Sequence, residues 1–441
     1  MSSLPAIVIF GMLIISALSV PLVIRFVTSP EPAPTKTAAD ELPQQVSTDS
    51  PTQKAKQDPV EADIATPPVT LPADVSAAEH RQLRRILMVG QDADMYPTIE
   101  AALQARQPGD IIELHNREPV FCRPGASWTV SDHLIIRAGK GVQPIVVREP
   151  TLPGMLVSFS ADKQNPKARV TLSGLCFVNV TPLNSSGGPR HASVYASCGI
   201  DLNHCLFVTT NAGLKWEAER FQNRATVTDC YFYGLQTDVT DLINTGHGEL
   251  IVQNNLIVGG RRAITVGGGL DPNSGQFSNV RLSGNTILHC EKLLTLYGPS
   301  RVTSEQNLFA RQRQSHAFVV GTPVRSMADV HRMFNYKGRA NVFFQTRWGI
   351  YPTKLQQGNG IARWQHLTQN SELQPRMLDP GFLDPKTVAA AVGSLQPARG
   401  LAASINASTS LPAGAVTGRL PNLPNGLGSI VQDALRKSGL L

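Results

Sequence analysis

Val170-Thr-Leu-Ser-Gly-Leu-Cys-Phe177 is the first of seven similar segments that recur through the middle of the 441-residue chain. Each segment alternates apolar and polar residues, turns through a bend and ends in a second apolar pair. One position in the bend aligns all seven copies, and it holds Leu175, Cys205, Cys230, Asn255, Asn285, Asn307 and Asn341. The steps between these positions are 30, 25, 25, 30, 22 and 34 residues. A recurrence of this length is typical of solenoids, in which successive repeats stack on one another.

The alternation predicts short β-strands with one buried face. Two such strands cannot bury their inner faces alone, but stacking the next copy on top closes a core and pairs the backbone. A third apolar strand fits between the copies, at Gly213–Trp216, Arg262–Val266, Lys292–Tyr297 and Ser315–Val320. Three strands and three turns per repeat predict an all-β fold, the right-handed parallel β-helix. A β-sandwich is the alternative, but its turns should recur about every 8–12 residues, and the recurrence here is longer.

The aligned bend position predicts a structural ladder, because it holds Asn in the last four copies and Cys or Leu in the first three. Buried amides need partners, and a column of them can hydrogen-bond from one coil to the next. Cys205 and Cys230 share this position on adjacent coils, about 4.8 Å apart, so either a disulfide or two buried thiols is compatible with it. The six cysteines show no zinc-binding spacing, and no metal site is predicted.

Residues 1–27 are predicted to form a transmembrane anchor, because the chain from Leu4 to Ile24 carries no charge and is long enough to cross a bilayer. A cleaved signal peptide is the alternative, but the basic segment that should precede its apolar run is missing. Arg25 alone favours a cytoplasmic C-terminal side. An anchor followed by a long tether favours the opposite arrangement, a single-pass membrane protein with its folded domain on the extracytoplasmic side.

Residues 28–79 are rich in Pro, Ala and Thr and are predicted to be a disordered linker. This segment has a net charge of −6, which leaves +12 on residues 80–441. A basic, elongated surface is suited to an acidic polysaccharide, a cell-wall polymer or an anionic lipid surface. Nucleic acid is not an expected partner, because no basic motif interleaved with aromatic residues is present.

The residues from Tyr96 to Leu114 predict a cap for the first coil. Thr98 can cap a helix with an apolar face, and Pro108-Gly109 would end it before a strand over 111–114. Such a helix covers the open end of a solenoid. The β-helix is predicted over residues 80–385, interrupted at 321–337 by an insertion with a short helix near 327–334. Residues 386–441 are predicted to be an irregular tail with a short helix around 430–435.

Thr98-Ile-Glu-Ala-Ala-Leu103, Pro108-Gly-Asp-Ile-Ile-Glu-Leu114 and the segment from Leu134 to Val147 resemble the pectin-lyase-like right-handed β-helix superfamily. The resemblance covers about residues 85–345. This part of the chain is similar to modules found in bacterial membrane-anchored proteins, and some of those modules follow a Ser/Thr kinase domain. Leu378-Asp-Pro-Gly-Phe382 resembles the tail that closes many such coils. The resemblance implies the fold and leaves the activity open, because this fold hosts lyases, hydrolases, esterases and binding modules.

Enzymes of this superfamily work on the outer face of one sheet, where lyases hold Ca²⁺ with several carboxylates and hydrolases use clustered Asp. On the third strand the expected outward positions include Ala263 and Leu293, together with the candidate binding residues Lys215, Thr265, Thr295 and Tyr297. No column of carboxylates appears among them. Since Ca²⁺ needs several oxygen ligands, it is expected only if the protein is a lyase, and no other cofactor is predicted.

One constellation remains a candidate catalytic site: Asp238, Asp241, His247 within Gly246-His-Gly248, and Arg262. The Gly-His-Gly motif resembles the hydrolases of the superfamily, and a pair of Asp residues could supply acid and base. The alternative is a turn with an exposed His and a solvated Asp. The sequence therefore favours a protein that binds carbohydrate or cell-wall polymer without turnover. A polysaccharide lyase or glycoside hydrolase, and a protein-binding scaffold or sensor ectodomain, stay open as alternatives.

Overall fold

The structure is a computed structural model that describes 84–122, 127–148, 155–181, 191–217, 223–235, 240–267, 276–310, 318–320, 331–344, 346, 350–351, 372–373 and 419–438. The described residues all belong to one compact unit, Ser76–Leu441. The predicted anchor (1–27) and linker (28–79) lie outside them. Within the described part of the chain, no helix is long and apolar enough to cross a membrane.

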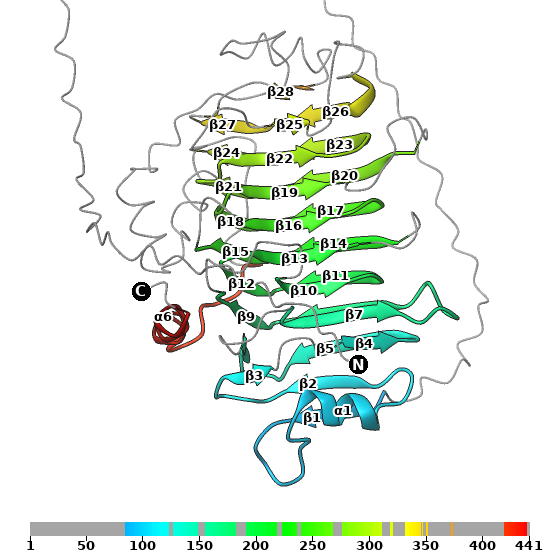
Figure 1. Ribbon diagram of the computed structural model, residues 1–441, viewed down its shortest axis with the longest axis vertical. Coiled ribbons are helices and arrows are strands. Elements are labelled where there is room, and N and C mark those ends of the chain that lie inside the picture. Colours follow the sequence, from blue (N-terminus) through cyan, green and yellow to red (C-terminus); the bar gives the residue numbers. More distant parts are fainter. Residues whose placement is uncertain are drawn as a thin grey trace, which may run out of the picture. The chain divides into compact units, whose positions relative to one another are not determined.

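Three parallel sheets make up the fold (Figure 1). Sheet A contains β1 (Ile86–Val89), β2 (Ile111–Leu114), β5 (His133–Ala138), β8 (Arg169–Ser173), β11 (Gly199–Asn203), β14 (Arg224–Thr228), β17 (Glu249–Gln253), β20 (Ser278–Ser283), β23 (Ser300–Glu305), β26 (Phe334–Arg339) and β29 (Glu372–Leu373). Sheet B contains β3 (Val120–Cys122), β6 (Ile145–Arg148), β9 (Cys176–Asn179), β12 (Leu206–Thr209), β15 (Tyr231–Gly234), β18 (Leu256–Gly259), β21 (Thr286–Leu288), β24 (Leu308–Ala310) and β27 (Val342–Phe344). Sheet C contains β4 (Ser127–Val130), β7 (Val157–Ala161), β10 (Ala192–Ala196), β13 (Ala212–Trp216), β16 (Asp241–Thr245), β19 (Arg262–Val266), β22 (Lys292–Leu296), β25 (Phe318–Val320) and β28 (Ile350–Tyr351).

From β2 onward, consecutive strands enter sheets A, B and C in strict rotation. Each strand therefore pairs with the strand three places before it and the strand three places after it, and the chain coils as a parallel β solenoid. The expectation of an all-β fold built from parallel sheets is confirmed. The third strand expected between the copies is present in sheet C, as β13, β19, β22 and β25.

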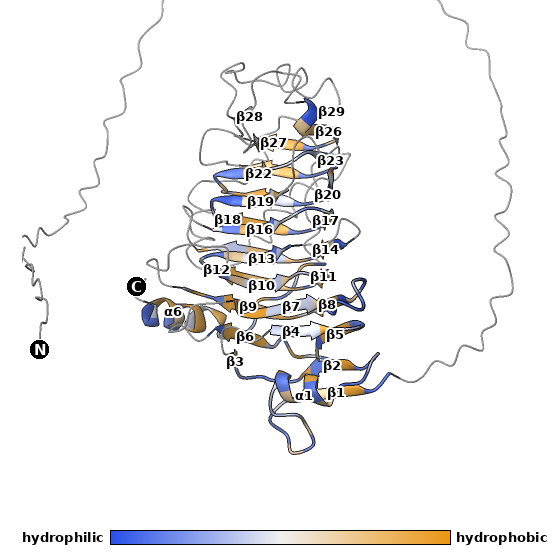
Figure 2. Cartoon of the chain, turned by 45° about the vertical axis from the view of Figure 1, so that its right-hand side comes forward, coloured by the Kyte–Doolittle hydropathy of each residue, from blue (hydrophilic) through white to orange (hydrophobic). Residues whose placement is uncertain are grey.

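The apolar residues of the repeated segments fill the interior of the coil. Figure 2 shows where hydrophobic residues lie along the strands. Phe177, Phe207 and Phe232 lie on successive strands of sheet B, with ring centroids 5.2 Å and 4.5 Å apart. Leu and Ile residues of sheets A and C pack against this column in the same buried cluster. Because every coil places similar side chains at the same position within its turn, each layer of the core packs on the layer below it.

The bend between sheets A and B carries a ladder of buried side chains. Asn285 Oδ1 accepts hydrogen bonds from the backbone N and Nδ2 of Asn255, each at 3.0 Å, and Asn307 Oδ1 accepts from the backbone N of Asn285 at 2.9 Å. Bonds of the same kind extend the column to Asn341 and Cys230, and the backbone N of Cys205 contacts Cys230 Sγ at 3.4 Å. Leu175, which forms no such side-chain bond, is buried in the core cluster.

The first coil is capped as predicted. Helix α1 (Ile99–Ala105) begins after Thr98, whose Oγ1 accepts a hydrogen bond from the backbone N of Ala101 at 3.1 Å. The loop before it covers the free edge of β1, because the backbone N of Tyr96 donates to Met88 O at 2.8 Å. An uncovered edge strand would offer unpaired backbone groups to other chains, and this loop satisfies part of that edge.

Three expectations are corrected by the structure. Residues 334–337 belong to strand β26 of sheet A and are not part of an insertion, although 331–333 are helical. Ala263 and Leu293, expected to point outward, are buried in the core cluster, because the chain turns from sheet B into sheet C there and simple alternation fails. The tail helix extends over α6 (Leu427–Lys437), which is longer than the predicted 430–435, and it packs on the apolar outer face of sheet B.

Candidate functional site

The outer face of sheet A carries two columns of side chains, set by the alternation of its strands. The first column is Arg169, Gly199, Arg224, Glu249, Asn279, Arg301 and Asn335, from β8 to β26. The second column, two residues further along each strand, is Thr171, Asp201, Thr226, Ile251, Arg281, Thr303 and Lys337. The residues between these columns, such as Val280 and Val302, point into the core.

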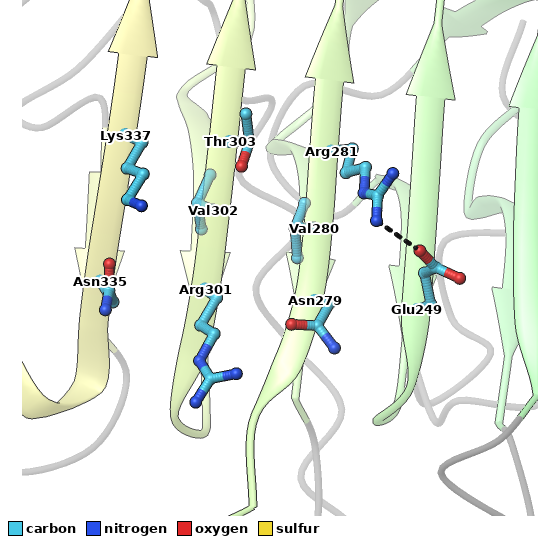
Figure 3. Close-up of a pocket in the computed structure, with 9 residues that line it drawn as sticks. All are labelled: Glu249, Asn279, Val280, Arg281, Arg301, Val302, Thr303, Asn335 and Lys337. Carbon is cyan, nitrogen blue, oxygen red and sulfur yellow. Dashed lines mark ion pairs between the residues drawn. The ribbon is translucent and has the colours of Figure 1, made fainter.

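Two hollows lie on this face and meet at Glu249. The larger, of about 540 Å³, is lined by Glu249, Asn279, Val280, Arg281, Arg301, Val302, Thr303, Asn335 and Lys337 (Figure 3). The smaller, of about 330 Å³, is lined by Pro166, Lys167, Arg169, Gly199, Asn223, Arg224 and Glu249. Because Glu249 lines both, the two hollows adjoin, and we refer to them together, from β8 to β26, as the sheet A groove.

The sheet A groove is strongly basic. Six cations line it, Lys167, Arg169, Arg224, Arg281, Arg301 and Lys337, against the single carboxylate of Glu249. Five of the six are exposed, and Arg169 is partly exposed. An open surface lined by one sign of charge attracts ligands of the opposite sign.

Contacts within the groove engage some of these cations. Arg281 Nη2 lies 3.3 Å from Glu249 Oε1, and the Arg281 side chain is 66% exposed, so this ion pair is solvated and weak. The guanidinium of Arg301 lies over the Phe277 ring, 4.6 Å from its centroid. Arg169 forms a two-pronged ion pair with Asp201. Among the described residues, Arg224 and Lys337 make no ion pair.

The candidate binding residues of sheet C lie in a different environment. Lys215, Thr265 and Thr295 occupy one outward row with Asn244, but they are 6%, 3% and 1% exposed. Lys215 Nζ contacts Glu217 Oε1 at 2.6 Å, and within the described structure the hydroxyls of Thr265 and Thr295 have no hydrogen-bond partner. Tyr297, just after β22, is 37% exposed. This row therefore offers far less accessible surface than the sheet A groove.

The candidate catalytic residues are brought together only in part. Asp241 and Arg262 are neighbours on β16 and β19 and form an ion pair of 2.9 Å, with side chains 17% and 16% exposed. Burial raises the pKa of Asp241, and the charge of Arg262 opposes that shift. His247 follows the other end of β16, so strand length places it roughly 15–20 Å along the chain from Asp241. Burial lowers the pKa of His247. Asp238 lies outside the described residues.

The buried cysteines do not form a site. All six thiols are free and buried, and burial raises the pKa of Cys122 to about 12 and also raises the pKa of Cys230. Thiols of this kind are poor nucleophiles and behave as small apolar side chains. Over the ranges that the structure describes, no group of His, Cys, Asp and Glu is arranged to hold a metal ion.

Sequence reasoning missed the sheet A groove because it searched for polar columns only on the third strand of each repeat. The signal was present in the first strand, where the alternation that buries Val280 and Val302 also turns Arg281 and Arg301 outward. Neither a scan of protein-family models nor a search of curated protein sequences finds a match to this chain.

Proposed function

We propose that the protein binds an acidic polysaccharide along the sheet A groove and does not turn it over. The observation that carries this proposal is the set of six cations that line two adjoining hollows, which together cross seven strands of a single sheet. Neighbouring strands are about 4.8 Å apart, so the groove extends for roughly 29 Å, the length of several sugar units. A rigid parallel sheet holds the backbone of these residues at fixed spacing, so binding has to order only their side chains.

The neutral residues of the groove support a carbohydrate ligand. Asn279 and Asn335 offer both donors and acceptors, and Thr303 offers a hydroxyl, all within the larger hollow. Sugar hydroxyls pair with such groups, while carboxylates or sulfates pair with Arg and Lys. A single-stranded nucleic acid would call for aromatic side chains on which bases stack, and none of the lining residues is aromatic.

Binding without turnover fits the carboxylates of the described residues better than catalysis. A glycosidase needs two carboxylates at a fixed separation, and a calcium-dependent lyase needs several oxygen ligands. The sheet A groove has one lining carboxylate, Glu249, and it faces Arg281. Asp241, in sheet C, forms an ion pair with Arg262. The lyase or hydrolase alternative therefore has no supporting geometry in this part of the chain.

The same proposal includes the type of β-helix and the location of the protein. The rotation of strands through three sheets and the Asn ladder support a right-handed parallel β-helix of the pectin-lyase-like type. The uncharged stretch within residues 1–27 and the Pro-rich linker that follows support a membrane-anchored protein with its coil on the extracytoplasmic side, where such polymers occur.

Retention on immobilised polygalacturonate or hyaluronate, measured at increasing salt, tests the proposal. The protein should be retained at low salt and released as salt rises, because exposed charge pairs are screened. The double variant Arg301→Glu/Lys337→Glu should weaken binding by at least about tenfold. Arg436→Glu, on the exposed side of α6, is the matched control and should bind as the native protein does. Equal loss in the control, or no retention of the native protein on either polymer, would remove the proposal.

A further inference from the structure

Four of the six cations of the sheet A groove lie on alternate strands. Arg169, Arg224, Arg281 and Lys337 lie on β8, β14, β20 and β26, at outward positions of the two columns. Two steps of about 4.8 Å separate successive members of this series along the stack, which gives a charge repeat of about 10 Å. That spacing corresponds to two sugar units, so successive cations of this series would face every second sugar of a bound chain.

Two of the three intervening strands carry acids in the two columns. Asp201 lies on β11 and Glu249 on β17, between the cationic strands, and Glu249 is 31% exposed within the groove. The third intervening strand, β23, carries Arg301, whose guanidinium packs over the Phe277 ring. Across β8 to β20, positive and negative strands therefore alternate without exception.

Ion pairing between neighbouring strands does not account for the whole pattern. It explains Arg169 and Arg281, which contact Asp201 and Glu249. It does not explain Lys337, which lies beside Thr303 of β23 and makes no ion pair among the described residues. Lys337 thus keeps the two-strand spacing from Arg281 where no ion pair requires it, although Arg301 adds a cation on the strand between them.

We infer that the groove selects an acidic polymer whose negative charge falls on alternate units, and that Glu249 is the specificity-determining residue. This inference rests on the proposed function and narrows its ligand class. A polymer aligned with this charge pattern places its carboxylates beside the cations of β8, β14, β20 and β26. A neutral or amide-bearing unit then lies beside Glu249. The Glu249 carboxylate can accept a hydrogen bond from a hydroxyl or amide N–H of that unit.

A uniformly charged polymer fits this groove less well. With one carboxylate on every sugar, some carboxylate must lie close to Glu249 wherever the chain is placed. Like charges brought together across an interface are a common source of discrimination between ligands. Glu249 thus acts against homopolymers, while the flanking Arg224 and Arg281 attract alternating ones.

The test compares two probes that differ in charge spacing. Oligosaccharides of equal length from hyaluronate, with a carboxylate on every second sugar, and from polygalacturonate, with one on every sugar, are titrated calorimetrically into the full chain at fixed salt. The native protein should prefer the hyaluronate probe by about tenfold. Glu249→Gln should reduce this preference to about threefold or less, chiefly through tighter binding of polygalacturonate.

Glu305→Gln is the matched control, because Glu305 is exposed on the same face at β23 but does not line either hollow. It should leave the preference unchanged. A native preference for polygalacturonate, equal affinity for both probes, or an unchanged preference in Glu249→Gln would overturn the inference and leave the proposed function standing. Failure of both probes to bind the native protein would overturn the proposed function itself.

Discussion

At the scale of single residues, the ladder shows why Asn is suited to the bend between sheets A and B. Asn285 is fully buried, and its side-chain amide accepts from Asn255 while its Nδ2 donates to Val252 O at 2.7 Å and Asn307 Oδ1 at 2.9 Å. The residue before the ladder position has a positive φ in the last six copies, between 53° and 61°. The side chain thus satisfies backbone groups that this left-handed corner removes from the strand pairing.

Replacing Asn285 with Ala should lower the free energy of unfolding by about 2–4 kcal/mol, because the backbone N of Asn255 and the carbonyl of Val252 both lose buried partners. Urea unfolding followed by circular dichroism measures the change. Asn279→Ala, an exposed Asn only six residues earlier, is the control and should change stability by less than about 0.5 kcal/mol. Equal effects of the two substitutions would show that the ladder bonds contribute nothing.

His247 should make stability depend on pH. Burial lowers its pKa in the folded protein below the ordinary value of 6.5, so the unfolded chain binds more protons between the two pKa values. Its contribution to stability is complete above about pH 6.5 and decreases as the pH falls below that value. His247→Gln should therefore lose less stability than the native protein between neutral pH and pH 5. Parallel curves for the two proteins over that interval would contradict the assignment.

At the scale of elements, α6 joins the tail to the coil. Its Leu427, Val431 and Ala434 are buried in one apolar cluster with outward residues of sheet B, including Val178 and Val208. The outer face of sheet B is thus apolar where the outer face of sheet A is polar, and the helix supplies cover for it. Its exposed side carries Asp433 and Lys437, which form an ion pair of 2.7 Å.

Val431→Asp should release α6 from sheet B while leaving the coil folded. The substitution removes apolar burial worth about 1.5–3 kcal/mol and places a charge in an apolar contact. Hydrogen exchange of the α6 amides should become fast, with little change in sheet A. Gln432→Asp, on the exposed neighbouring position, should leave exchange slow. Unchanged protection in Val431→Asp would mean that the contact with sheet B does not hold the helix.

Strands and the cap were predictable from sequence because their signals are local. Thr98 and Pro108 delimit α1, and alternation around Val170 or Val280 marks the strands of sheet A. Alternation fails at corners, which is why Ala263 and Leu293 were misplaced. The helix around Val431 could be expected from its pattern, but its docking depends on an apolar face of sheet B whose residues, such as Val178 and Val208, lie far away in the sequence.

The candidate site, too, could be predicted from the sequence only in part. The outward direction of Arg224, Arg281 and Lys337 follows from strand alternation. Their alignment on one face depends on the register of four successive strand pairs, and Glu249 lies among them for the same reason. Repeats of 22 to 34 residues leave that register undetermined until the turns are placed.

At the scale of the whole molecule, the coil is a series of layers in which each strand pairs only with its neighbours above and below. Stability in such a structure is close to a sum over layers and their interfaces. Removal of one complete layer should therefore leave a foldable coil, provided that the ends of the deletion occupy equivalent positions. The layer from Thr286 to Asn307 meets this condition, because Asn285 and Asn307 hold the same ladder position.

Deletion of residues 286–307 should give a folded protein with a lower unfolding midpoint, in which β24 follows Asn285 directly and β26 pairs with β20. Arg281 and Lys337, now two strands apart, would become neighbours in one column, and Arg301 would be lost. The spacing between these two cations of the second column would shorten from about 10 Å to about 5 Å. If charge spacing governs selection, the preference for the hyaluronate probe over polygalacturonate should shrink while binding persists. A folded deletion variant with an unchanged preference would show that spacing between layers has no part in recognition, and a variant that does not fold would show that the layers are not interchangeable.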